Sequence, residues 1–164
     1  MSEAVATPVS LKADIVHRIQ MGKGLVQADL NAMTEEMLCS CPGGKARCAY
    51  DLVFEMSMLN RAVANNLRGE SGGLPSPEGW VRAPREYHVK SSAIKDLGDS
   101  TDELLSAFES VPEEKLAQEI DTPIGKMTIG RLMTIMGAHL MYHSGQLNYI
   151  QTIHGDDAFH WAEA

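Results

Sequence analysis

Two histidines, His139 and His143, lie one helical turn apart in the long apolar segment from 129 to 153. Counting in steps of three and four residues places both imidazoles, together with Gln146, on the face that also carries Ile, Leu and Met. Two imidazoles at this spacing can bind one transition-metal ion. The alternative is a pair of ordinary core histidines whose ring nitrogens are hydrogen-bonded within the protein. We favour the metal because an ion satisfies several buried polar groups at once.

A third ligand is predicted in the segment from 46 to 68, whose apolar stripe contains Glu55. An unpaired carboxylate on a buried helix face is costly, so Glu55 is expected to face a cation. Asp51, one turn earlier, is a rival ligand or a supporting group, but it falls at the edge of the stripe and is expected to be solvated. The predicted metal ligands are therefore Glu55, His139 and His143, a set that suits Zn(II), Ni(II), Fe(II) or Mn(II).

Other arrangements of metal-binding residues fit the sequence less well. The metalloprotease motif His-Glu-x-x-His fails because Leu140 stands where its glutamate belongs. A di-iron bundle needs two Glu-x-x-His elements, and the chain has none. Cys39, Cys41 and Cys48 lack the paired spacing of a structural zinc site, so we expect them to be reduced thiols.

Four long helical patterns would position these residues, over about 10–32, 46–68, 91–111 and 129–153. Ser10 and Thr128 are predicted helix caps, and Pro112 is predicted to stop the third helix. A long loop over 69–87 and an extended stretch before Thr128 connect the helices. No alternating strand pattern of any length is present, so the predicted fold class is all-α, an antiparallel four-helix bundle. At 164 residues the chain is expected to form one domain, 1–164.

The charge pattern restricts the partners of the protein. Asp and Glu total 22 against 14 Lys and Arg, which gives a formal net charge of −8, and the basic residues are scattered. We therefore expect no nucleic-acid partner and no anionic membrane partner. No apolar run approaches the ~20 residues that cross a bilayer, and the N-terminal residues do not look like a secretion signal. A cytoplasmic location is the expectation.

The chain resembles the DinB-like superfamily of bacterial helical proteins over nearly its whole length. The resemblance is strongest at His139-x-x-x-His143, followed by Ser144-Gly145-Gln146 and by Gly155-Asp156, and it extends to the lead-in Thr122-Pro123-Ile124-Gly125. Family members carry a third histidine ligand seven residues after the start of the second helix, and counting seven from Cys48 gives Glu55. Glu in place of His lowers the charge of the ligand set by one. Ser144 stands where the family usually has Arg.

The resemblance implies a divalent metal ion and a metal-dependent transferase that acts with a low-molecular-weight thiol on a small-molecule substrate. It also implies a homodimer. It does not identify the catalytic residues or the substrate. The alternative is a non-catalytic dimeric bundle with a stress-related or ligand-binding role, in which Glu55 pairs with a protonated histidine and the altered site needs no metal.

Overall fold

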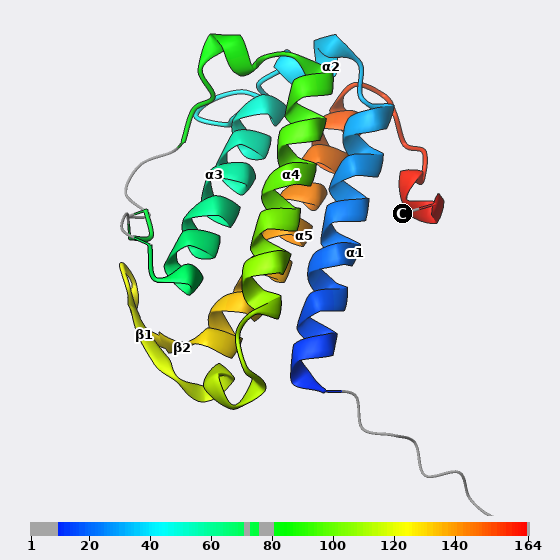
Figure 1. The fold of residues 1–164 in the computed structure, drawn as a ribbon. Coiled ribbons are helices and arrows are strands. Elements are labelled where there is room, and N and C mark those ends of the chain that lie inside the picture. Colours follow the sequence, from blue (N-terminus) through cyan, green and yellow to red (C-terminus); the bar gives the residue numbers. More distant parts are fainter. Residues whose placement is uncertain (1–9, 71–72, 76–80, 164) are drawn as a thin grey trace, which may run out of the picture.

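The computed structural model describes residues 10–70, 73–75 and 81–163, and it confirms a mostly helical fold (Figure 1). Its α-helices are α1 (Leu11–Ala32), α2 (Glu35–Cys39), α3 (Ala49–Arg68), α4 (Lys90–Glu109) and α5 (Ile129–Ile153). Two short strands, β1 (Glu119–Thr122) and β2 (Gly125–Thr128), precede α5. Short 3₁₀ helices lie at η1 (Arg85–Tyr87), η2 (Glu113–Ala117) and η3 (His160–Glu163).

Side-chain caps set where the helices begin. The hydroxyls of Ser10 and Thr128 each accept a hydrogen bond from a backbone N–H three residues later, so both predicted caps are confirmed. Thr34 does the same and starts the five-residue α2. Helix α3 begins at Ala49 rather than near 46, because the Asp51 carboxylate accepts the backbone N–H of Cys48 and fixes Cys48 as the cap.

A hairpin was not anticipated from the sequence. Strands β1 and β2 pair antiparallel, with Glu119 opposite Thr128 and Thr122 opposite Gly125. Each strand has four residues, which is too short for a clear alternation of apolar and polar residues. Gly125 has a φ of 110° and makes the tight turn possible. The predicted extended stretch before α5 is therefore a small two-stranded sheet.

The four long helices lie side by side, with α1 packed mainly on α5 and α3 mainly on α4 (Figure 1). Gly22 allows α1 to approach α5 closely, since a Cβ added there would lie 2.8 Å from the Cβ of Leu140. The core between the helices is built from aliphatic, methionine and a few aromatic side chains. Helix α3 and helix α5 face each other across the side of the molecule that carries the predicted ligands.

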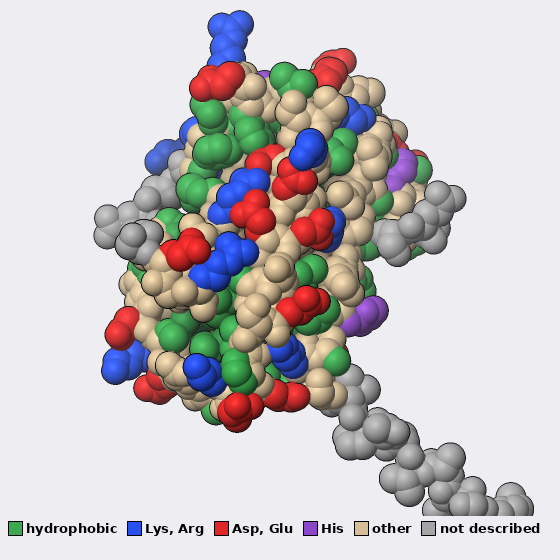
Figure 2. All heavy atoms as spheres, in the orientation of Figure 1, with side chains coloured by type: hydrophobic (Ala, Val, Ile, Leu, Met, Phe, Trp, Pro, Cys, Tyr) green, Lys and Arg blue, Asp and Glu red, His purple; other side chains and the backbone are tan. Residues whose placement is uncertain are grey.

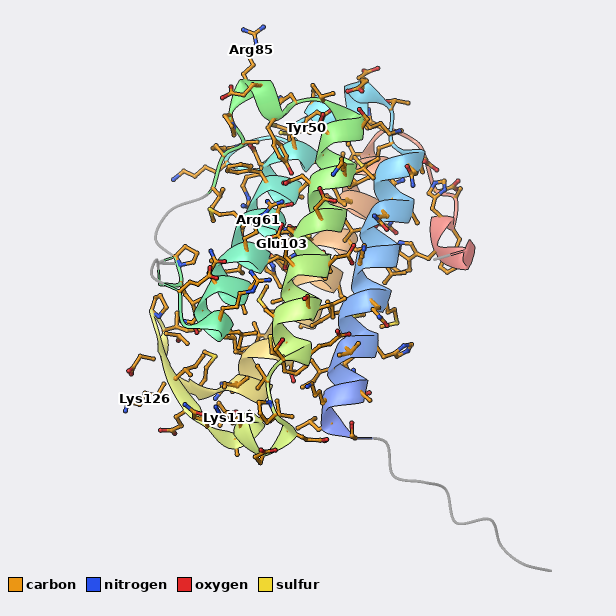
Figure 3. The ribbon with its side chains drawn as sticks, viewed as in Figure 1. Tyr50, Arg61, Arg85, Glu103, Lys115 and Lys126 are labelled. Carbon is orange, nitrogen blue, oxygen red and sulfur yellow. The ribbon has the colours of Figure 1, made fainter. Side chains whose placement is uncertain are left out.

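The exposed side of α3 and α4 carries mixed charges (Figure 2). Arg61 of α3 donates to Asp96 at 2.6 Å and to Glu103 at 3.3 Å, and Figure 3 shows Arg61 and Glu103 next to each other. Such half-exposed pairs contribute little to stability individually. Of the helices that the structure describes, none is long and apolar enough to cross a membrane.

Candidate metal centre

The structure brings Glu55, His139 and His143 together between α3 and α5. The Nε2 atoms of the two imidazoles are 2.9 Å apart. Glu55 Oε1 lies 3.4 Å from Nε2 of His139 and 3.7 Å from Nε2 of His143. A tetrahedral ion with bonds of ~2.0–2.1 Å keeps its ligand atoms about 3.3 Å apart. The three observed separations bracket this value. The side chains therefore fit a divalent ion with little rearrangement.

The protonation of the two imidazoles also suits a cation. Burial lowers the pKa of His139 to about 4, and the positive charge of Arg47 acts in the same direction. The pKa of His143 falls to about 3, chiefly through burial, with His139 and then Arg47 as further causes, although the hydrogen bond to Gln146 opposes the fall. Both rings are therefore neutral at pH 7, which is the state that binds a metal ion.

Gln146 fixes the orientation of His143. Its Oε1 lies 2.7 Å from His143 Nδ1, and its amide nitrogen donates to the Tyr142 hydroxyl at 3.1 Å. An amide oxygen can only accept, so Nδ1 of His143 carries the hydrogen and Nε2 turns its lone pair toward Glu55 and His139. The 2.9 Å contact between the rings is then a hydrogen bond only when His139 Nε2 carries a hydrogen. An ion at this point would replace that hydrogen.

Arg47 is a part of the site that sequence reasoning missed. Its guanidinium donates to Glu55 Oε2, and its side chain is only 4% exposed. Arg47 lies just before α3, outside any helical stripe, so periodicity could not indicate it. The Arg47–Glu55 pair is formally neutral, so the guanidinium offsets the negative charge that Glu55 brings to the site. The alternative arrangement pairs Glu55 with a protonated histidine; in the structure Glu55 also accepts from Arg47, and burial lowers the pKa of both imidazoles.

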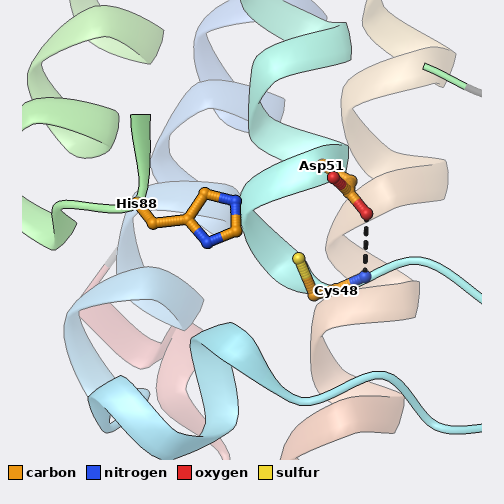
Figure 4. Close-up of side chains that lie close together, drawn as sticks. All are labelled: Cys48, Asp51 and His88. Carbon is orange, nitrogen blue, oxygen red and sulfur yellow. Dashed lines mark hydrogen bonds between the residues drawn. The ribbon is translucent and has the colours of Figure 1, made fainter. Parts of the chain in front are cut away.

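Cys48, Asp51 and His88 form a second group of side chains that could hold a metal ion, with ligand atoms within 4.8 Å of one another (Figure 4). Asp51 is buried, so the expectation that it is solvated is wrong. It accepts from Arg82 at 2.7 Å, from the backbone N–H of Ala83 at 2.8 Å and from that of Cys48 at 3.3 Å. These donors account for the carboxylate as a helix cap without an ion.

The cysteines are free thiols. Cys39 and Cys41 are exposed, whereas Cys48 is buried. Burial raises the pKa of Cys48 to about 11, so its thiol stays protonated at pH 7 and behaves as a small apolar side chain. The predicted reduced state of the three thiols agrees with this arrangement.

Ser144, next to the second imidazole, anchors α5 to α1. Its hydroxyl donates to the buried carboxylate of Asp29 at 2.6 Å. Asp29 also accepts from the Asn148 amide at 2.6 Å and from the Trp161 indole N–H at 2.8 Å. Burial raises the pKa of Asp29, and these donors oppose the rise. Ser144 thus contributes a buried hydrogen bond between α5 and α1.

A family model described as the DinB superfamily matches residues 51–147, a range that contains Glu55, His139 and His143. The crystal structure of a conserved protein of a locus from Enterococcus faecalis has the same fold, with a TM-score of 0.70. The likeness covers 90% of this chain and 99% of that chain at 16% sequence identity, so it speaks for the fold alone. Comparison with curated proteins gives no match.

Proposed function

Because the chain belongs to the DinB superfamily, we propose that Glu55, His139 and His143 hold a divalent metal ion and that the protein is a metal-dependent transferase acting with a small thiol. The observation that carries the proposal is the convergence of three ligand atoms within 4.8 Å of one another, from two neutral imidazoles and one carboxylate. We further propose an antiparallel four-helix bundle for the long helices, and Zn, Ni, Fe or Mn as the ion.

The reaction would be the transfer of a thiol sulfur to an electrophilic carbon. A bound divalent ion lowers the pKa of a thiol or water and so supplies a nucleophile near neutral pH. The thiol loses its proton to solvent, its sulfur forms a bond to the carbon, and the leaving group departs with the bonding pair. Gln146 keeps His143 in the ligand tautomer and Arg47 holds Glu55 in place. Side-chain exposures of 22% for Glu55 and 15% for His139 leave the site open to small molecules.

We also propose that the protein is a cytoplasmic homodimer. It would bind a small-molecule substrate and neither nucleic acid nor membrane. The net charge of −8 supports the exclusion of nucleic acid. Sedimentation equilibrium at micromolar concentration tests the dimer, and a single species of monomer mass would refute it.

The second candidate function is a non-catalytic bundle that binds metal weakly or not at all. The Arg47–Glu55 pair favours it, because the carboxylate already faces a cation of the protein itself. In this case Arg47, Glu55 and the two neutral rings contact one another without an ion.

Metal analysis of protein purified without a metal-binding tag separates the two functions. We expect one equivalent of a divalent metal in the native protein, and its loss in Glu55→Ala and in His143→Ala. His17→Ala is the matched control, since His17 is an exposed histidine of α1 and its replacement should leave the metal content unchanged. If the native protein stays metal-free even after treatment with Zn, Ni, Fe and Mn salts, the non-catalytic function replaces the transferase.

Thiol conjugation by the metal-loaded protein is then measured with and without a chelator. Activity that survives complete removal of the metal would refute the metal-dependent mechanism and leave the proposed metal site to the metal analysis.

A further inference from the structure

Two pockets flank the Glu55–His139–His143 site along the line where α3 faces α5. The first has a volume of about 360 Å³ and is lined by Leu52 of α3, by Gln146 and Ile150 of α5, and by Lys45 and Arg47 of the segment before α3. It adjoins the site directly, since Arg47 contacts Glu55 and Gln146 contacts His143. We call it the Lys45 pocket.

The second pocket lies on the other side of the site and has a volume of about 140 Å³. Its walls include Leu59 of α3, Ile135 and Met136 of α5, and Ile124 and Met127 of the hairpin. None of the described residues that line it is charged. We call it the apolar pocket.

The helical positions show that both pockets and the site share one seam. Leu52, Glu55 and Leu59 lie on successive turns of one face of α3, as do Gln146, His143, His139 and Met136 on α5. Leu59 lies seven residue steps along the helix from Leu52, or about 10 Å at ~1.5 Å per residue. A molecule that extends from one pocket to the other would pass over the carboxylate and the two imidazoles.

The two ends of the seam differ in charge. Lys45 and Arg47 line the first pocket, and its described lining contains no acidic residue. Lys45 is exposed and forms no ion pair with any residue that the structure describes, in a chain whose net charge is −8. An exposed cation beside a pocket attracts an anionic group, whereas the uncharged wall of the apolar pocket favours hydrocarbon.

We propose that the seam binds an elongated substrate with an anionic end at the Lys45 pocket and an apolar end in the apolar pocket, so that the part between them lies at the metal site. This inference rests on the proposed function only for the reaction that would follow binding of the substrate. Binding itself needs only the two pockets, and it can therefore be measured on metal-free protein.

The test is calorimetric binding of straight-chain carboxylates, from butanoate to octanoate, to chelator-treated native protein. Affinity should rise about fourfold for each added methylene that enters the apolar pocket, at ~0.8 kcal/mol per buried methylene. 1-Octanol, which lacks the anionic end, should bind more weakly than octanoate. Lys45→Gln should weaken octanoate up to about fivefold, the size of an exposed ion pair, and leave 1-octanol unchanged.

Two variants of α5 examine the apolar end. Ile135→Asp places a charge at the wall of the apolar pocket and should abolish the gain with chain length, while Met141→Asp, also on α5 but outside the pocket, should preserve it. These residues are 38% and 43% exposed, so both variants should fold. An affinity independent of chain length, equal binding of octanol and octanoate, or the same loss in both variants would overturn the proposal.

Metal analysis keeps this outcome separate from the proposed function. One equivalent of metal together with no carboxylate binding would refute the seam alone. Carboxylate binding with the expected chain-length dependence in a protein that takes up no metal would refute the transferase and keep the seam.

Discussion

The Arg47–Glu55 pair makes a quantitative prediction about stability. Removing one partner of a buried ion pair costs ~3–5 kcal/mol, because the other charge stays buried without it. Two features of the structure reduce this value: Glu55 keeps 22% exposure, and the Asp51 carboxylate also acts on Arg47. We therefore expect Glu55→Gln to lower the free energy of unfolding of metal-free protein by about 2–3 kcal/mol. Arg47→Met should cost less, about 1–2 kcal/mol, because water reaches the Glu55 carboxylate that remains.

Equilibrium unfolding in urea, with chelator present, measures both variants and the double variant Arg47→Met/Glu55→Gln. The double variant has neither charge, so it should be more stable than the sum of the two single losses predicts, by at least about 1 kcal/mol. If the single losses add to within about 0.5 kcal/mol, the two side chains are not coupled and the account of the pair is refuted.

Three further predictions concern His143, the acid stability and the helix contact. Gln146→Ala should weaken metal binding ~10–100-fold in a chelator competition, because the hydrogen bond to His143 Nδ1 is lost; an unchanged affinity would contradict the tautomer assignment. In metal-free protein the pKa values of about 4 for His139 and about 3 for His143 lie below the ~6.5 of an unfolded histidine, so the unfolded chain binds protons first. The free energy of unfolding should therefore fall as the pH drops from about 6.5 toward 4. Urea unfolding across this pH range should show a smaller fall for His139→Gln than for the native protein. Gly22→Ala should destabilise by about 1–3 kcal/mol, since its Cβ would lie 2.8 Å from a leucine carbon of α5, whereas the unobstructed Gly145→Ala should gain up to about 1 kcal/mol; similar urea midpoints for both would contradict the close approach.

The helical period explains why the site could be anticipated from the sequence. Glu55 and the two histidines occupy positions where one face of a helix otherwise carries apolar residues, and a face that repeats every three to four residues is visible in a single chain. The preference of Ser and Thr for cap positions placed two of the helix starts. The role of the three residues as metal ligands stays a prediction until metal is measured.

The partners contributed by irregular segments could not be anticipated in this way. Arg47 precedes α3, and Arg82 and Ala83 follow a long connection, so no period relates them to the carboxylates that they contact. Asp51 lies at the edge of its stripe and was therefore expected to be solvated, but Arg82 and Ala83 donate to it and it is buried. Of the long loop over 69–87, positions 71–72 and 76–80 lie outside the described residues, and Leu74 and Pro75 line the apolar pocket.

The contact between the Trp161 indole and Asp29 has a practical consequence for experiments on this protein. The C-terminal segment supplies one of the donors to a carboxylate in the interior, so a truncation after Gly155 would remove it and loosen the end of α5. The sequence contains two tryptophans, and a Trp80→Phe background would leave Trp161 as the sole indole. Its emission would then report whether the chain end is docked against α1. Because Asp29 also accepts from Ser144 of α5, that signal would report on the contact between α1 and the helix that carries both imidazoles, without any added dye or label.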